Sequence, residues 1–141
     1  MERRNFIKNC TLLCASGIGI AAFMQSCGSI HYATSTIETN KIKILKTEFI
    51  DKKNAERKFV VVRSEKTQFP ICLYKKDKEF IGVSMECTHQ GCELNPNETT
   101  LVCPCHGSEF SKEGKVMSPP ADKDLKQFKV TTDNETIYIE I

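Results

Sequence analysis

From Lys41 to the end of the chain, apolar and polar residues alternate in short segments. A two-residue period puts successive side chains on opposite faces of a strand, so each segment predicts a half-buried β-strand. The last segments alternate on either side of an Asp133-Asn134 turn, and no segment keeps a 3.6-residue period. The pattern therefore predicts an all-β fold, most simply a small antiparallel β-sandwich or barrel.

The apolar positions of these segments are the candidate core. Cys72 lies in the middle of one segment and is interpreted as a small buried apolar residue rather than a reactive thiol. The predicted core residues are Phe59, Val61, Ile71, Phe80, Val83, Phe128, Val130 and Ile139.

The first 27 residues differ in character from the rest. Arg3, Arg4 and Lys8 precede a stretch of apolar or small residues that runs from Thr11 to Met24. A charged start, an apolar middle and a small-residue end are typical of a secretory signal. The Arg-Arg pair followed by Phe-Ile-Lys resembles the twin-arginine export signal, and a plain signal that contains two arginines is the alternative.

The end of this segment suggests attachment to a membrane. Met24-Gln25-Ser26-Cys27 resembles a loose lipobox, in which Cys27 would carry the lipid. The apolar stretch is shorter than the about 20 residues that span a bilayer. Three fates stay open: lipid anchoring at Cys27, an uncleaved helix, and release. The first two would leave an exported domain tethered on the periplasmic side of a bacterial membrane.

The segment 28–40 is rich in Ser, Thr and small residues and is predicted to be a linker, with His31 facing solvent. The folded domain is then expected over 41–141. Of the 20 Lys and Arg and 18 Asp and Glu, three and one respectively precede Cys27, so the remaining chain is neutral. A neutral body offers no basic face, which argues against a nucleic-acid partner.

Eight cysteines in a short chain point to disulfides, a metal site or both. Two motifs hold four of them, Cys87-Thr88-His89-Gln90-Gly91-Cys92 and Cys103-Pro104-Cys105-His106-Gly107-Ser108. A pure disulfide framework would leave both histidines unused. A zinc site with two Cys and two His is chemically reasonable, but it does not account for the two further cysteines or for the glycine in each motif.

The paired motifs resemble the Rieske family, in particular its quinol-oxidising, disulfide-containing branch. The resemblance is close from Cys87 to Ser108 and extends loosely to Ala121, so the cluster-binding part would cover about residues 85–121. It implies one [2Fe–2S] cluster within a Rieske-like sandwich. The ligands implied are Cys87 and Cys103 on the buried iron and His89 and His106 on the outer iron.

The resemblance also assigns the remaining motif residues. Cys92 and Cys105 would form a disulfide that ties the two loops together, which suits an exported protein. Gly91 and Gly107 would permit turns that a Cβ atom would hinder. Ser118-Pro119-Pro120-Ala121 matches the family's proline loop, a third wall over the cluster.

Two further residues are expected to tune the cluster. Ser108 matches a serine whose hydroxyl donates a hydrogen bond to a bridging sulfide. Phe110 stands where the high-potential members carry a tyrosine that donates to a ligand thiolate. Because hydrogen bonds to sulfur raise the reduction potential, we expect a potential below that of those members.

The function implied is electron transfer. Two thiolates neutralise the oxidised core, so its reduction is easier than with four thiolates.

Expected partners are quinol or a redox protein, such as the cytochrome b or c of a quinol-oxidising complex; the alternative is a lipid-anchored carrier for another exported reductase or oxygenase system. A ring-hydroxylating oxygenase needs a second iron site with two more histidines, and only His31 remains. The chain has no independent catalytic site, so oxidoreductase activity is expected only within a complex.

Overall fold

The computed structural model describes residues 29–141, and these residues form three four-stranded antiparallel sheets and one short 3₁₀ helix, η1 (Lys46–Phe49). The all-β prediction is therefore confirmed. The predicted export signal, its apolar stretch and Cys27 lie outside the described residues. From residue 29 onward, no helix has the length and hydropathy needed to cross a bilayer.

The first sheet has the strand order β1-β2-β12-β11. Its strands are β1 (Ser35–Glu38), β2 (Lys41–Leu45), β11 (Val130–Thr132) and β12 (Thr136–Glu140). Ile42 faces Ile139 across the central pair, and both are fully buried, while Lys43 on the same strand turns outward. This sheet shows the expected alternation, because one face packs on the core and the other meets water.

The middle sheet has the order β10-β5-β4-β3. Its strands are β3 (Phe59–Val62), β4 (Ile71–Lys76), β5 (Glu79–Ser84) and β10 (Gln127–Phe128). Val60 and Val62 belong to the core shared with the first sheet, whereas Val61 belongs to a second core on the opposite face. All three are 0% exposed. The continuous Val-Val-Val run therefore reflects a strand that is covered on both faces.

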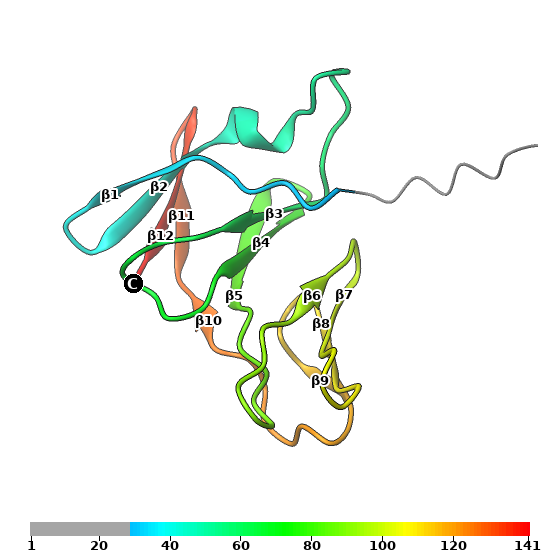
Figure 1. The fold of residues 1–141 in the computed structure, drawn as a ribbon. Helices are drawn as coiled ribbons and strands as arrows, with labels where there is room; N and C mark the ends of the chain where they lie inside the picture. Colours follow the sequence, from blue (N-terminus) through cyan, green and yellow to red (C-terminus); the bar gives the residue numbers. More distant parts are fainter. Residues whose placement is uncertain (1–28) are drawn as a thin grey trace, which may run out of the picture.

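The third sheet has the order β6-β7-β8-β9 and lies below the middle sheet in Figure 1. Its strands are β6 (Asn95–Pro96), β7 (Thr100–Val102), β8 (Glu109–Ser111) and β9 (Val116–Ser118). We call residues 85–126 the small lobe, since the chain enters it after β5 and leaves it before β10. The buried Tyr74 hydroxyl on β4 joins the lobe to the middle sheet. It donates to the carbonyl oxygens of Asn97 and Thr100, at 3.0 and 3.1 Å.

The prediction that residues 28–40 form a linker is wrong for most of this segment. The backbone N–H of Val61 donates to the His31 carbonyl and that of Ala33 to the Val61 carbonyl, at 2.9 and 2.8 Å, so this segment runs along the edge of β3. The chain then continues as β1 on the first sheet. His31 Nε2 lies 2.6 Å from Glu48 Oε2 on η1, which holds the ring against the domain. The folded part thus begins before residue 41.

The predicted core is correct in half of its members and partly so in the others. Val61, Ile71, Val83 and Ile139 are fully buried. The remaining four are only partly buried and pack against the two cores: Phe59, Phe80, Phe128 and Val130. Cys72 is 0% exposed, as expected, and burial raises the pKa of its thiol far above the ordinary value. A thiol held protonated in this way is unreactive.

Candidate metal centre

Two loops at one end of the small lobe have the same backbone design. In the first, the N–H of Cys87 donates to the Cys92 carbonyl at 2.9 Å, and the N–H of Gly91 returns to the Cys87 carbonyl at 2.8 Å. In the second, the N–H of Cys103 donates to the Ser108 carbonyl at 2.8 Å, and the N–H of Gly107 returns to Cys103 at 3.0 Å. Each motif therefore closes into a turn that begins at a cysteine.

The glycine of each loop is required by the turn. Gly91 has φ of 72° and Gly107 has φ of 77°, in the left-handed region that glycine adopts without a steric penalty. A Cβ atom built on Gly107 would meet nothing within 4 Å, so the backbone conformation rather than crowding within the protein explains this glycine. The sequence-based expectation for both glycines thus has a structural basis in the turn itself.

The four predicted ligands divide into an inner and an outer pair. Cys87 and Cys103 are each 2% exposed and belong to the core beneath the loops. His89 and His106 are exposed, and their ring centroids lie 5.2 Å apart at an interplanar angle of 88°. The loops therefore bring two thiols together on the protein side and two imidazoles together on the solvent side.

The two thiols have different pKa values. Burial raises the pKa of Cys87 above its ordinary value, and contact with the Cys103 thiol adds to the rise, although the backbone N–H groups of His89 and Gln90 oppose it. Burial acts in the same direction on Cys103, but the Cys87 thiol and the backbone N–H groups of Cys105 and His106 outweigh it and lower the pKa of Cys103. N–H groups directed at sulfur favour the thiolate, which is the form that binds metal.

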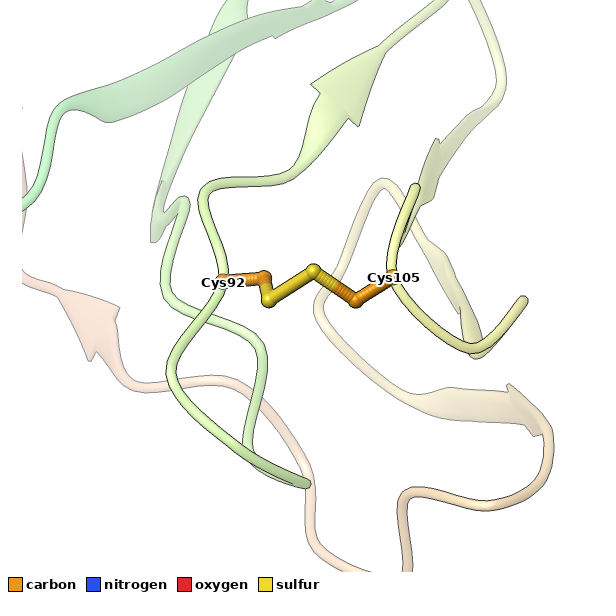
Figure 2. Close-up of a disulfide and its surroundings, with 2 residues drawn as sticks. All are labelled: Cys92 and Cys105. Carbon is orange, nitrogen blue, oxygen red and sulfur yellow. A yellow bond between two sulfur atoms is a disulfide. The ribbon is translucent and has the colours of Figure 1, made fainter.

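A disulfide joins the two loops. Cys92 and Cys105 are bonded, with an S–S distance of 2.03 Å, as the family resemblance implied. Figure 2 shows the bridge passing from the first loop to the second. The Sγ atoms of Cys92, Cys103 and Cys105 all lie within 4.8 Å of one another. Because two of these sulfurs are in the disulfide, this trio does not form a thiolate site; it shows that the bridge lies directly beside a predicted ligand.

A third segment closes the site. The buried Ser108 hydroxyl oxygen accepts a hydrogen bond from the Ala121 N–H at 3.0 Å, which ties the second loop to the proline segment. Since the oxygen accepts this bond, its own proton is free to donate. Pro119 and Pro120, joined by a cis peptide bond, are exposed beside the loops. Phe110 is 0% exposed and pairs with Leu101 across β7 and β8.

One contributor was not anticipated from the sequence. The Thr88 hydroxyl donates to the Lys123 carbonyl at 2.6 Å, so the first loop is fastened to the third segment as the second loop is through Ser108. The acceptor is a backbone oxygen, which any residue could supply. No sequence signal could therefore have identified this contact.

Comparison with known proteins agrees with this geometry. The Rieske [2Fe-2S] domain family matches residues 36–129. The chain belongs to the Rieske [2Fe-2S] domain family. The match begins within β1, which agrees with the structure in placing this strand inside the domain.

Several Rieske proteins are similar to this chain over part of its length. The cytochrome b6-f complex iron-sulfur subunit of Chlorobaculum tepidum is 39% identical over 62 residues, which cover 43% of this chain and 34% of the relative. Subunit 1 of the Nostoc sp. complex is 37% identical over 75 residues, covering 50% and 42%. The chain thus matches less than half the length of these relatives.

A solved structure supports the same relationship. The cyanobacterial plasma membrane Rieske protein PetC3 from Synechocystis PCC 6803 superimposes with a TM-score of 0.53 at 28% identity, covering 60% of this chain and 87% of that protein. The domain of this family binds one [2Fe–2S] cluster. Two inner thiols and two outer imidazoles are donors that fit such a cluster.

Proposed function

We propose that this protein is an electron carrier whose [2Fe–2S] cluster is held by Cys87 and Cys103 on the inner iron and by His89 and His106 on the outer iron. The observation that carries the proposal is the division of the donors into two buried thiols and two exposed imidazoles on matched loops. When bound, a cluster with this ligand set accepts one electron at a higher potential than a four-thiolate cluster.

The residues around the ligands have distinct tasks in this proposal. Burial of the two thiols excludes water from the inner side, while the exposed imidazoles form the path by which a partner reaches the site. The Ser108 hydroxyl oxygen accepts from the Ala121 N–H, and its own proton would donate to sulfur and so favour the reduced state. The disulfide and the Thr88 contact keep the two loops and the third wall in register.

We further propose that the protein is exported by the twin-arginine route and held on the periplasmic side of a membrane through residues 1–27, with Cys27 as the lipid attachment point. The Arg3-Arg4 pair and the Met24 to Cys27 segment support this placement. The similarity to a plasma membrane Rieske protein and to cytochrome b6-f subunits supports a membrane quinol-oxidising complex as its working partner.

The test is to purify the full chain from mildly solubilised membranes and to add a reduced quinol. We expect b-type haem absorbance to co-purify with the protein. We also expect the electron paramagnetic resonance signal of the reduced cluster to appear within one turnover of the co-purified complex. An inhibitor of quinol oxidation should prevent the signal. A cluster that dithionite reduces, but that stays oxidised with quinol, would instead favour a carrier for another exported reductase.

Phe110 gives a prediction about the potential. Replacing Phe110 with tyrosine is expected to raise the midpoint potential, because the added hydroxyl lies at the position from which high-potential relatives donate to a ligand thiolate. A hydrogen bond that favours the reduced state by about 1 kcal/mol corresponds to a rise of about 40 mV for one electron. A redox titration followed by visible absorbance measures this shift.

A matched substitution separates this effect from a general response to a new hydroxyl. Phe80 packs against the core between the first and middle sheets, away from the two loops, so Phe80→Tyr should leave the potential unchanged. An unchanged potential in Phe110→Tyr, with the cluster retained, would show that the position does not tune this site.

A further inference from the structure

Charge is distributed unevenly between the two ends of this neutral domain. Residues 85–111, which carry both loops, contain four glutamates and neither lysine nor arginine. Residues 41–84, which form most of the other two sheets, contain twelve Lys and Arg against six Asp and Glu. The glutamates of the first set are Glu86, Glu93, Glu98 and Glu109.

These carboxylates lie on the surface of the small lobe. Three are exposed and Glu109 is half-buried. Within the described part of the chain, Glu93 alone among them has an ion-pair partner, Arg63, at 2.9 Å. Both side chains of that pair are about half exposed, so solvent screens the attraction and the pair neutralises the charge only locally.

Three of the carboxylates border the two loops. Glu86 directly precedes Cys87, and Glu93 directly follows Cys92. The two glutamates face each other across the neck of the first loop in an antiparallel bridge, and like charges in this position are locally unfavourable. Glu109 directly follows Ser108 at the end of the second loop. Glu98 lies in the β6–β7 turn, at the other end of the lobe.

The segment that follows the second loop and contains the proline loop does not cancel this negative charge. Residues 112–126 contain four lysines and three acidic residues. Lys115 pairs with Asp124 at 2.6 Å, and Lys76 pairs with Glu113 at 3.5 Å. The small lobe therefore keeps a net charge of −3, and the other described residues carry +3. A cluster with two thiolate ligands is neutral when oxidised and adds one negative charge when reduced, which strengthens the asymmetry.

We propose that the acidic rim formed by Glu86, Glu93 and Glu109 is a docking surface for a redox protein with a lysine- and arginine-rich face around its own redox group. The inference rests on the proposed role in electron transfer. Charge complementarity favours such a partner. The field of a basic protein would orient this domain with its acidic end, which carries the exposed histidines, toward the partner. An acidic partner would be repelled from the same end.

The test uses reduced, cluster-loaded protein and two c-type cytochromes of opposite net charge as electron acceptors, mixed by stopped flow at several salt concentrations. The rate with the basic cytochrome should fall as salt rises, and the rate with the acidic cytochrome should rise, since salt screens attraction and repulsion alike. In Glu86→Gln/Glu109→Gln, the rate with the basic cytochrome at low salt should fall about 3- to 10-fold.

A control variant and a small oxidant make the outcome specific. Glu135 is exposed in the β11–β12 turn, on the first sheet, and Glu135→Gln removes the same kind of charge without changing the rim. This variant should react like the unmodified protein. Equal salt dependence with both cytochromes, while ferricyanide still oxidises the cluster, would overturn the docking surface alone. A protein with no cluster that ferricyanide can oxidise would overturn the proposed electron transfer as well.

Discussion

Replacing His89 with alanine, or His106 with alanine, is expected to yield protein without the [2Fe–2S] cluster. Each substitution removes one of the two imidazoles that the loops place 5.2 Å apart on the solvent side. The outer iron would then lack one protein ligand, and the nearby Cys92 and Cys105 could not supply it because they are bonded to each other. Visible absorbance, iron analysis and electron paramagnetic resonance of dithionite-reduced protein measure the loss.

The third histidine provides the matched control. His31 pairs with Glu48 on η1, in the part of the domain formed by the first two sheets, and does not contribute to either loop. His31→Ala is therefore expected to keep a full cluster spectrum, even though it loses a contact that holds the N-terminal segment. This comparison separates a ligand from a histidine that contributes to the fold.

The ligand assignment would fail if the double variant His89→Ala/His106→Ala retained its iron and its resonance signal. Colourless unmodified protein that contains one zinc ion would be equally decisive. In that case Cys87, Cys103 and the two histidines would be a zinc site, for which these four donors are also suitable.

Removing the disulfide is expected to have the largest effect on stability. The bridge closes a segment with a sequence separation of 13 residues. The chain-entropy relation for a loop of this size gives a loss of about 3 kcal/mol in the free energy of unfolding for Cys92→Ser/Cys105→Ser. Guanidinium unfolding followed by circular dichroism, under oxidising conditions, measures the change. Both cysteines are replaced so that no unpaired thiol remains beside Cys103.

A reductant provides an internal check on this prediction. It should lower the unfolding midpoint of the unmodified protein toward that of the double variant, and it should leave the variant itself unchanged. If the variant and the unmodified protein unfold at the same denaturant concentration, the bridge adds no stability to the domain. Cys72 is buried in the middle sheet and is a free thiol among residues 29–141, so it should not contribute to the difference.

The strands were predicted best where one face is buried and the other is wet. On β12, Ile137 and Ile139 alternate with outward residues, and a period of two identifies such a strand. On β3, Val60, Val61 and Val62 are all buried, whereas the alternation rule selected only Val61 of these three. A run of apolar residues shows that a strand is buried, but not that two separate cores lie on its two faces.

The N-terminal segment shows why edge strands are difficult to predict. Ser35–Glu38 has little apolar character, and its burial pattern is mostly exposed. Its position in the fold comes from backbone hydrogen bonds to β2, together with those of His31 and Ala33 to β3. Because every residue except proline can make such backbone hydrogen bonds, composition does not reveal them. The polar composition of this stretch therefore predicted a linker.

The types and order of the donors were decided by the sequence alone. Two cysteines, two histidines and two turn glycines in spaced motifs indicate a mixed sulfur and nitrogen site, because side-chain chemistry and local turn geometry are properties of short segments.

The tertiary structure decided which donors face inward, how the loops are joined, and where charge accumulates. The glutamates of residues 85–111 can be counted in the sequence, but the equal numbers of acidic and basic residues after Cys27 gave no sign of a local excess. The fold brings the two loops together, and with them the three glutamates that border the loops, at one end of a domain whose other described residues carry +3. Burial, loop-to-loop contacts and electric dipoles depend on distances between segments remote in the chain, and those distances exist only once the sheets have packed.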